Sequence, residues 1–104
     1  MISTHVLDTA RGCPAADVRV ELYRDDELVA SELTDADGRV RELAEGELES
    51  GDYRLRFATR RYFERSGLNV FYPEVSVIFT IEDSSHLHVP LLLSPYGYTT
   101  YKGV

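Results

Sequence analysis

The sequence predicts an all-β protein, a sandwich of antiparallel strands with one short helix. Hydrophobic and polar residues alternate over several short segments, as they do in strands that bury one face. Turn-forming residues, such as the stretch "DADG" at 35–38, separate these segments. The 104 residues suffice for one hydrophobic core, so we expect a single domain over residues 1–104.

The first half of the chain is expected to form four strands. Residues 3–9 ("STHVLDT") predict the first strand, which ends at the loop "ARGCPAA". Val, Val and Leu alternate with polar residues over 18–24, which indicates a second strand with one buried face. A third strand is expected over 27–34, and a short one after Gly38, whose lack of a side chain suits a positive φ.

The second half is expected to contain the helix and the remaining strands. Residues 53–59 alternate in the same way, and 60–68 ("RRYFERSGL") predict two helical turns with Thr59 as a possible N-cap and Gly67 as a stop. A further strand is expected over 74–81. The segments 86–93 and 96–102 then predict a hairpin around Ser94 and Pro95.

The charge balance excludes some classes of partner. The net charge is −7, whereas nucleic acids and anionic membranes attract basic surfaces. No stretch reaches the roughly 18 apolar residues of a spanning helix, and "MISTHVLD" lacks the pattern of a signal peptide. We therefore expect a cytoplasmic protein that binds neither nucleic acid nor membrane. The single Cys13 is expected to be a packing or loop thiol.

Two histidines begin the last apolar segment, "HLHVPLLL". In a strand, His86, His88, Pro90 and Leu92 would share one face, opposite the side chains that enter the core. Pro90 cannot donate to a ladder, which favours an edge or an interruption there. A face of such mixed polarity suits a subunit contact or a ligand channel. From the residues alone, the pair could face solvent, bind Zn²⁺ or Cu²⁺, or carry out proton chemistry.

Three segments together resemble a known enzyme family. The stretches "STHVLDTARGCPAADVRVELYR", "TDADGR" and "HLHVPLLLSPYGYTTYKGV" are similar to the 5-hydroxyisourate hydrolases, the enzyme branch of the transthyretin-related family. The resemblance implies a transthyretin-like sandwich of two four-stranded sheets, assembled as a homotetramer with a central channel. It implies a catalytic set of His5, Arg39 and His88. It also places these residues near the substrate: His86, Tyr101, Lys102, Gly103 and Val104.

The same resemblance implies the reaction. The expected substrate is purine-derived 5-hydroxyisourate, the unstable product of urate oxidation. Hydrolysis of a ring amide would give 2-oxo-4-hydroxy-4-carboxy-5-ureidoimidazoline, with no metal or organic cofactor. A neutral imidazole suits the base and a guanidinium suits the developing oxyanion. The sequence does not decide whether His5 or His88 is the base. The alternative hypothesis is a transthyretin-like protein that binds a small ligand without catalysis.

The C-terminus departs from the family pattern. The family usually ends in Tyr-Arg-Gly-Ser, whereas this chain ends in Tyr101-Lys102-Gly103-Val104. Lysine keeps the positive charge but loses the planar fork of arginine, and valine lacks the hydroxyl of serine. We therefore expect the tail to slow the reaction without abolishing it.

Overall fold

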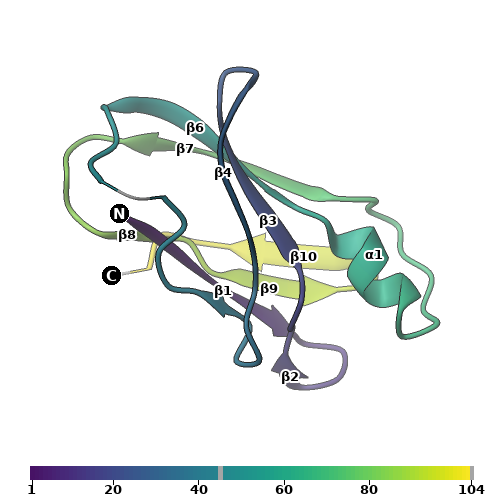
Figure 1. Cartoon of the computed structure of the whole chain (residues 1–104). Coiled ribbons are helices and arrows are strands. Elements are labelled where there is room, and N and C mark those ends of the chain that lie inside the picture. Colours follow the sequence, from purple (N-terminus) through teal and green to yellow (C-terminus); the bar gives the residue numbers. More distant parts are fainter. Residues whose placement is uncertain (45, 104) are drawn as a thin grey trace.

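Two facing β-sheets and one short helix make up the protein (Figure 1), as the sequence predicts. The computed structural model describes residues 1–44 and 46–103. One sheet has the order β4-β3-β6-β7. Its strands are β3 (Arg19–Arg24), β4 (Glu27–Leu33), β6 (Gly51–Phe57) and β7 (Val75–Ile81).

The other sheet is built around β1 (Ile2–Asp8). Its main path is β10-β9-β1-β2, with β2 at Cys13–Pro14, β9 at Leu91–Ser94 and β10 at Gly97–Thr100. Two short strands, β5 (Arg39–Val40) and β8 (Leu87–His88), also pair with β1. The expected four-strand path is therefore present, and β5 and β8 extend it. The sequence did not predict β2, which lies inside the expected loop.

The pairing of β1 with β8 and β9 is parallel, which corrects the expectation of a purely antiparallel sandwich. The chain crosses from β7 in one sheet to β8 in the other, so β8 is not joined to β1 by a hairpin and runs in the same direction as β1. The segment expected as one strand over 86–93 is interrupted at Val89 and Pro90. Proline has no N–H for the ladder, which accounts for the break. Pro90 is buried rather than on an open face.

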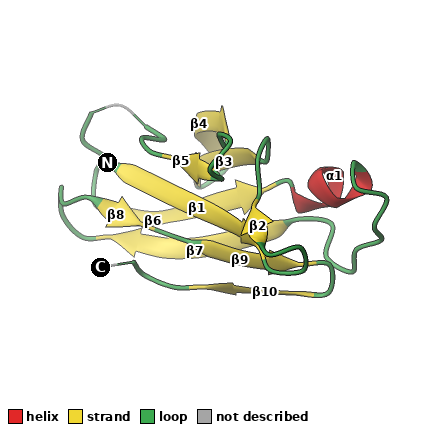
Figure 2. Cartoon of the chain, turned by 90° about the horizontal axis from the view of Figure 1, so that it is seen from below, coloured by secondary structure: helices red, strands yellow, loops and turns green. Residues whose placement is uncertain are grey.

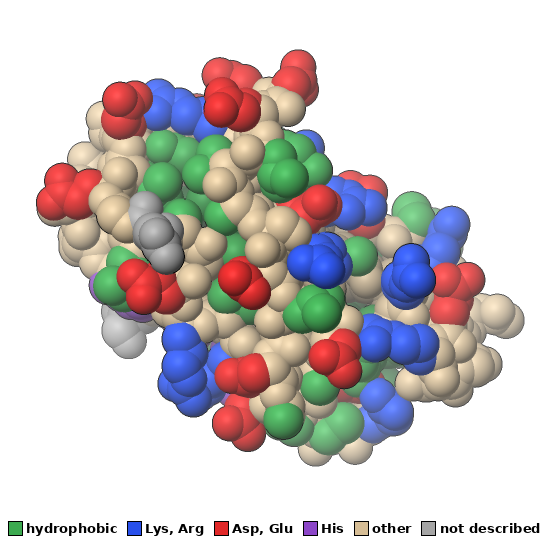
Figure 3. All heavy atoms as spheres, viewed as in Figure 1, with side chains coloured by type: hydrophobic (Ala, Val, Ile, Leu, Met, Phe, Trp, Pro, Cys, Tyr) green, Lys and Arg blue, Asp and Glu red, His purple; other side chains and the backbone are tan. Residues whose placement is uncertain are grey.

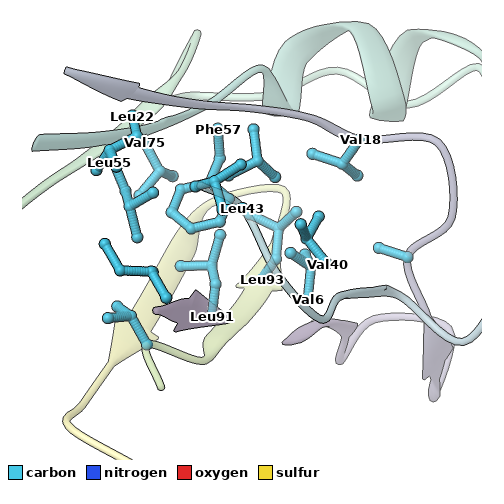
Figure 4. Close-up of a cluster of buried hydrophobic side chains, with 14 of the residues drawn as sticks. Val6, Val18, Leu22, Val40, Leu43, Leu55, Phe57, Val75, Leu91 and Leu93 are labelled. Carbon is cyan, nitrogen blue, oxygen red and sulfur yellow. The ribbon is translucent and has the colours of Figure 1, made fainter. Parts of the chain in front are cut away.

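Side chains from the inner faces of both sheets form the core, as Figure 4 shows. The alternation expected over 3–9, 18–24 and 53–59 is present, because every second residue of β1, β3 and β6 is buried. The close-up in Figure 4 labels these residues: Val6, Val18, Leu22, Val40, Leu43, Leu55, Phe57, Val75, Leu91 and Leu93.

The helix α1 (Thr59–Glu64) covers the end of the sandwich opposite the chain termini (Figure 2). The N-cap is Ala58 and not Thr59, so that prediction is wrong. Thr59 lies one residue inside the helix, where its hydroxyl is buried without a hydrogen-bond partner in the described structure. The chain turns away after Glu64 and reaches Gly67 with a φ of 72°.

Asp8 connects the end of β1 to this helix. Its Oδ2 accepts hydrogen bonds from the Tyr62 hydroxyl at 2.7 Å and from Arg11 Nε at 2.9 Å. Its Oδ1 accepts from the backbone N–H groups of Ala10 and Arg11, each at 3.0 Å. These contacts compensate a carboxylate that is 1 % exposed. These contacts anchor the end of the strand that carries His5 three residues before Asp8.

Candidate active site

Strand β1 lies between two short strands, β5 and β8, at the positions of its polar residues. On one side His5 pairs with Arg39 of β5, and on the other Ser3 pairs with His88 of β8. Directly paired residues project from the same face of a sheet. The structure therefore brings His5, Arg39 and His88 together, although 34 and 83 positions separate the second and third from the first.

The turn before β5 determines where Arg39 projects. Asp35 Oδ1 accepts hydrogen bonds from the backbone N–H groups of Asp37 and Arg39, each at 2.9 Å. Gly38 has a φ of 75°, and a Cβ there would lie 2.4 Å from the carbonyl oxygen of Val6. Only glycine allows this close approach. The turn thus packs against β1 and holds Arg39 beside His5.

His5 also contacts this turn. Its Nε2 lies 2.8 Å from the carbonyl oxygen of Asp37. A carbonyl only accepts hydrogen bonds, so Nε2 must carry the hydrogen. In the neutral ring the other nitrogen, Nδ1, is then unprotonated and can accept a hydrogen bond from a bound molecule.

His88 is held from two sides. The backbone N–H of Gly103 donates to the carbonyl of His88 at 2.8 Å, and its Nδ1 lies 2.8 Å from Ser3 Oγ. A Cβ on Gly103 would lie only 2.7 Å from Cδ2 of the imidazole, so the ring packs directly on the tail backbone. Within the described chain Nε2 has no hydrogen-bond partner, which leaves it for a ligand.

The surroundings of His88 favour its neutral form. Burial, the charge of Arg39, and then the charges of His5 and His86 hold the pKa of His88 below its ordinary value of 6.5. Desolvation disfavours the imidazolium, and nearby positive charges disfavour it further. A neutral imidazole with a free Nε2 can accept a proton near pH 7.

His86 lies directly before β8, not within the expected strand, and is exposed. Together with Tyr101 and Lys102 it lines a hollow of about 400 Å³ between the end of β7 and the C-terminal segment. His5, Arg39 and His88 lie outside this hollow. Histidine atoms reach the surface at the end of the molecule where the chain termini lie (Figure 3). Val104 falls outside the described residues.

A metal ion has no evident place in the described part of the chain. There, no group of three or more His, Cys, Asp or Glu side chains is arranged to hold one. His86 and His88 both bond to Ser3 instead.

A family model described as HIUase/Transthyretin family matches residues 2–103. This chain belongs to that family. A 5-hydroxyisourate hydrolase from Caulobacter vibrioides is 46% identical over 111 residues, spanning 98% of this chain and 96% of the relative. The structure of a Klebsiella pneumoniae 5-hydroxyisourate hydrolase has a TM-score of 0.94 and 37% identity, covering 99% of this chain and 98% of the other.

Transthyretin shares this fold within the family. The structure of transthyretin from Sparus aurata has a TM-score of 0.88 and 31% identity, covering 98% of this chain and 95% of the other. The family contains both enzymes and transthyretin, so the fold does not decide between catalysis and binding. That decision has to come from the residues of the site.

Sequence reasoning missed two contributors to the site. Ser3 shares the face of His5 on the first strand, which is a weak signal for a residue that touches both His86 and His88. The carbonyl of Asp37, which receives the His5 hydrogen bond, had no signal in the sequence, because a backbone group is the same in every residue.

Proposed function

We propose that this protein hydrolyses 5-hydroxyisourate to 2-oxo-4-hydroxy-4-carboxy-5-ureidoimidazoline, a step in urate breakdown. Membership of the family and the relatives named as 5-hydroxyisourate hydrolases support this function. The observation that carries the proposal within this chain is the meeting of two imidazoles and one guanidinium on β1 and its two neighbours. These groups suit water attack on a ring amide.

His88 is the general base in this mechanism. Its Nε2 accepts a proton from the attacking water, and its lowered pKa keeps the ring neutral near pH 7. Arg39 stabilises the negative oxygen that develops on the attacked carbonyl. His5, with Nε2 committed to the Asp37 carbonyl, accepts a substrate N–H at Nδ1 and so orients the ring. The leaving ring nitrogen takes its proton from His88.

The C-terminal segment is proposed to complete the substrate site. Gly103 contacts His88 directly, and Tyr101 and Lys102 line the hollow beside His86. Lys102 supplies a positive charge that suits an anionic or carbonyl-rich ligand. Val104 is included in the proposed site on the family pattern alone.

The active species is proposed to be a homotetramer. Strands β7 and β10 are the outermost strands of their sheets, and exposed apolar or aromatic side chains lie on or beside them. Ile78 is 74% exposed on β7, and Tyr98 and Tyr101 are 41% and 55% exposed near β10. An edge strand with exposed apolar side chains offers another chain both unpaired backbone groups and an apolar contact surface.

The cytoplasmic location and the absence of a cofactor stay predictions. In the described residues no helix is long and apolar enough to cross a membrane. Cell fractionation tests the location. Exhaustive chelation tests the cofactor, because a metal-independent enzyme keeps its rate, whereas loss of activity with recovery on Zn²⁺ addition would restore the metal hypothesis.

The decisive experiment follows the ultraviolet decay of freshly generated 5-hydroxyisourate with and without the protein. We expect strong acceleration by the native protein and a loss of at least about a hundredfold in His88→Asn and in Arg39→Ala, as for a missing base or oxyanion partner. Circular dichroism should be unchanged in both variants. Binding of a small aromatic ligand without accelerated decay would instead favour the transthyretin-like alternative.

A further inference from the structure

The hydroxyl of Ser3 joins two histidines at the site. Its Oγ lies 2.8 Å from Nδ1 of His88 and 2.8 Å from Nε2 of His86. Ser3 is 8% exposed, so the contacts are shielded from water on the Ser3 side. Parallel pairing of β1 with β8 creates this arrangement, because it places Ser3 directly opposite His88.

A hydroxyl has one hydrogen to donate, so the two contacts cannot be alike. In one arrangement, His88 donates Nδ1–H to Ser3 and Ser3 donates to His86 Nε2. In the other arrangement, His86 donates Nε2–H to Ser3 and Ser3 donates to His88 Nδ1. The first leaves Nε2 of His88 bare, and the second places the hydrogen there. The state of His86 therefore determines whether His88 is a proton acceptor or a proton donor.

We propose that Ser3 and His86 form a proton relay that switches His88 between general base and general acid. The inference rests on the proposed function and adds two positioning residues to it. Neither side chain has to touch the substrate, since both act through Nδ1 of His88.

The relay balances at every atom. When Nε2 of His88 takes a proton from water, the Nδ1 proton moves to Ser3 Oγ, the Ser3 hydroxyl proton moves to Nε2 of His86, and His86 releases its Nδ1 proton to solvent. All three groups end neutral. In the second half, Nε2–H of His88 protonates the leaving nitrogen, the two internal transfers reverse, and His86 regains a proton at Nδ1 from solvent.

The positions of the two histidines suit these roles. Arg39 and His5 flank His88 from β5 and β1, so a lasting positive charge on its ring is unfavourable there. His86 is exposed and lines the hollow beside the C-terminal segment, so it can exchange protons with water. The relay thus carries the excess proton from the crowded ring through His86 to the solvent.

The proton positions can be measured in the resting enzyme, without substrate. Long-range ¹⁵N–¹H spectra of histidine-labelled protein distinguish Nδ1–H from Nε2–H, with assignment by single His→Gln variants. We expect His88 and His86 both to carry their hydrogen on Nδ1. In Ser3→Ala, neither ring should keep a preference for the Nδ1–H form. A resting His88 with hydrogen on Nε2, or tautomers unchanged in Ser3→Ala, would overturn the relay even if the enzyme is active.

Kinetics provide the second test. Ser3→Ala and His86→Gln should each lower kcat about tenfold or more, at the weaker end of proton-transfer effects, whereas Ser3→Thr keeps the hydroxyl and should recover most of the rate. Because the two residues act as one unit, the double variant should be no slower than the slower single variant. In the native enzyme, the dependence of kcat on the deuterium fraction of the solvent should show that several protons move. In Ser3→Ala it should show that only one moves.

Ser31→Ala is the matched control, since Ser31 is an exposed hydroxyl on β4 that contacts Arg19, and we expect no effect on kcat. His86→Gln within twofold of the native rate would refute the relay. If the native protein fails to accelerate substrate decay, the proposed function fails, whereas the tautomer measurement still reports on the hydrogen-bonded network by itself.

Discussion

At the residue scale, Arg39 has two effects on the site. It is proposed to stabilise the oxyanion, and its charge also contributes to the lowered pKa of His88, after the larger effect of burial. The guanidinium thus stabilises the transition state, and it also helps to keep the His88 base neutral. The pH dependence of the reaction should therefore depend on Arg39, which lies on β5 and not on the strand of His88.

The pH profile should therefore reveal this coupling. Because the pKa of His88 lies below 6.5, kcat/KM of the native enzyme should stay high at pH 6.5 and fall only at lower pH, as the base becomes protonated. Arg39→Gln should move this acidic limb to higher pH, because one of the positive charges that oppose protonation is gone. An NMR titration of His88 in both proteins measures the shift independently of the rate.

The free energy of unfolding should also decrease as the pH falls. The folded protein binds a proton at His88 less readily than the unfolded chain, so protonation of this ring favours unfolding. The contribution is absent well above pH 6.5 and destabilises the fold as the pH falls below that value toward the folded-state pKa. For the rate profile, an acidic limb of kcat/KM that does not move in Arg39→Gln would show that Arg39 and His88 are not coupled.

At the scale of elements, the C-terminal segment supports β8. The backbone of Gly103 bonds to His88, and its missing side chain leaves room for the imidazole. The segment thus determines where the ring lies, in addition to lining the hollow. Displacements of about 1 Å at a catalytic group are costly, with losses that reach about a hundredfold.

Gly103→Ala should show this dependence. The new methyl group would lie 2.7 Å from Cδ2 of His88, so the ring or the tail must move, and we expect kcat/KM to fall between about tenfold and about a hundredfold. Gly97→Ala is the matched control, because its Cβ would meet only Ser94 Oγ at 3.6 Å. Equal values of kcat/KM in Gly103→Ala and Gly97→Ala would show that the C-terminal segment does not position His88.

At the scale of the whole molecule, both sheets end in strands with exposed apolar side chains. β7 is an edge of one sheet and exposes Ile78, and β10 is an edge of the other and exposes Tyr98. The chain has a net charge of −7, yet these positions are apolar. A single copy leaves them in contact with water.

Light scattering at assay concentration should detect a tetramer. Ile78→Glu should weaken assembly, because it places a charge on the edge of β7, which lies beside the hollow of the C-terminal segment. Leu28→Glu on β4, the opposite edge of the same sheet, serves as the control. It should leave the tetramer intact, because β4 is not part of the proposed contact. A fully active monomer, or dissociation in Leu28→Glu alone, would contradict the proposed assembly.

The sequence by itself determined the fold class and most of the strands, because alternation of apolar and polar residues is a local property. It also determined the family, since the matching motifs span the chain, and it nominated His5, Arg39 and His88 from those motifs. Tertiary structure decided the rest. The break at Pro90 was anticipated, but the parallel pairing of β8 with β1 depends on how the chain crosses between sheets. Ser3 joins the histidines only because that pairing sets it opposite His88, and Gly103 packs on the ring only because the tail returns to β8. Contacts between residues more than 80 positions apart arise from packing of the whole sandwich, which no local pattern encodes.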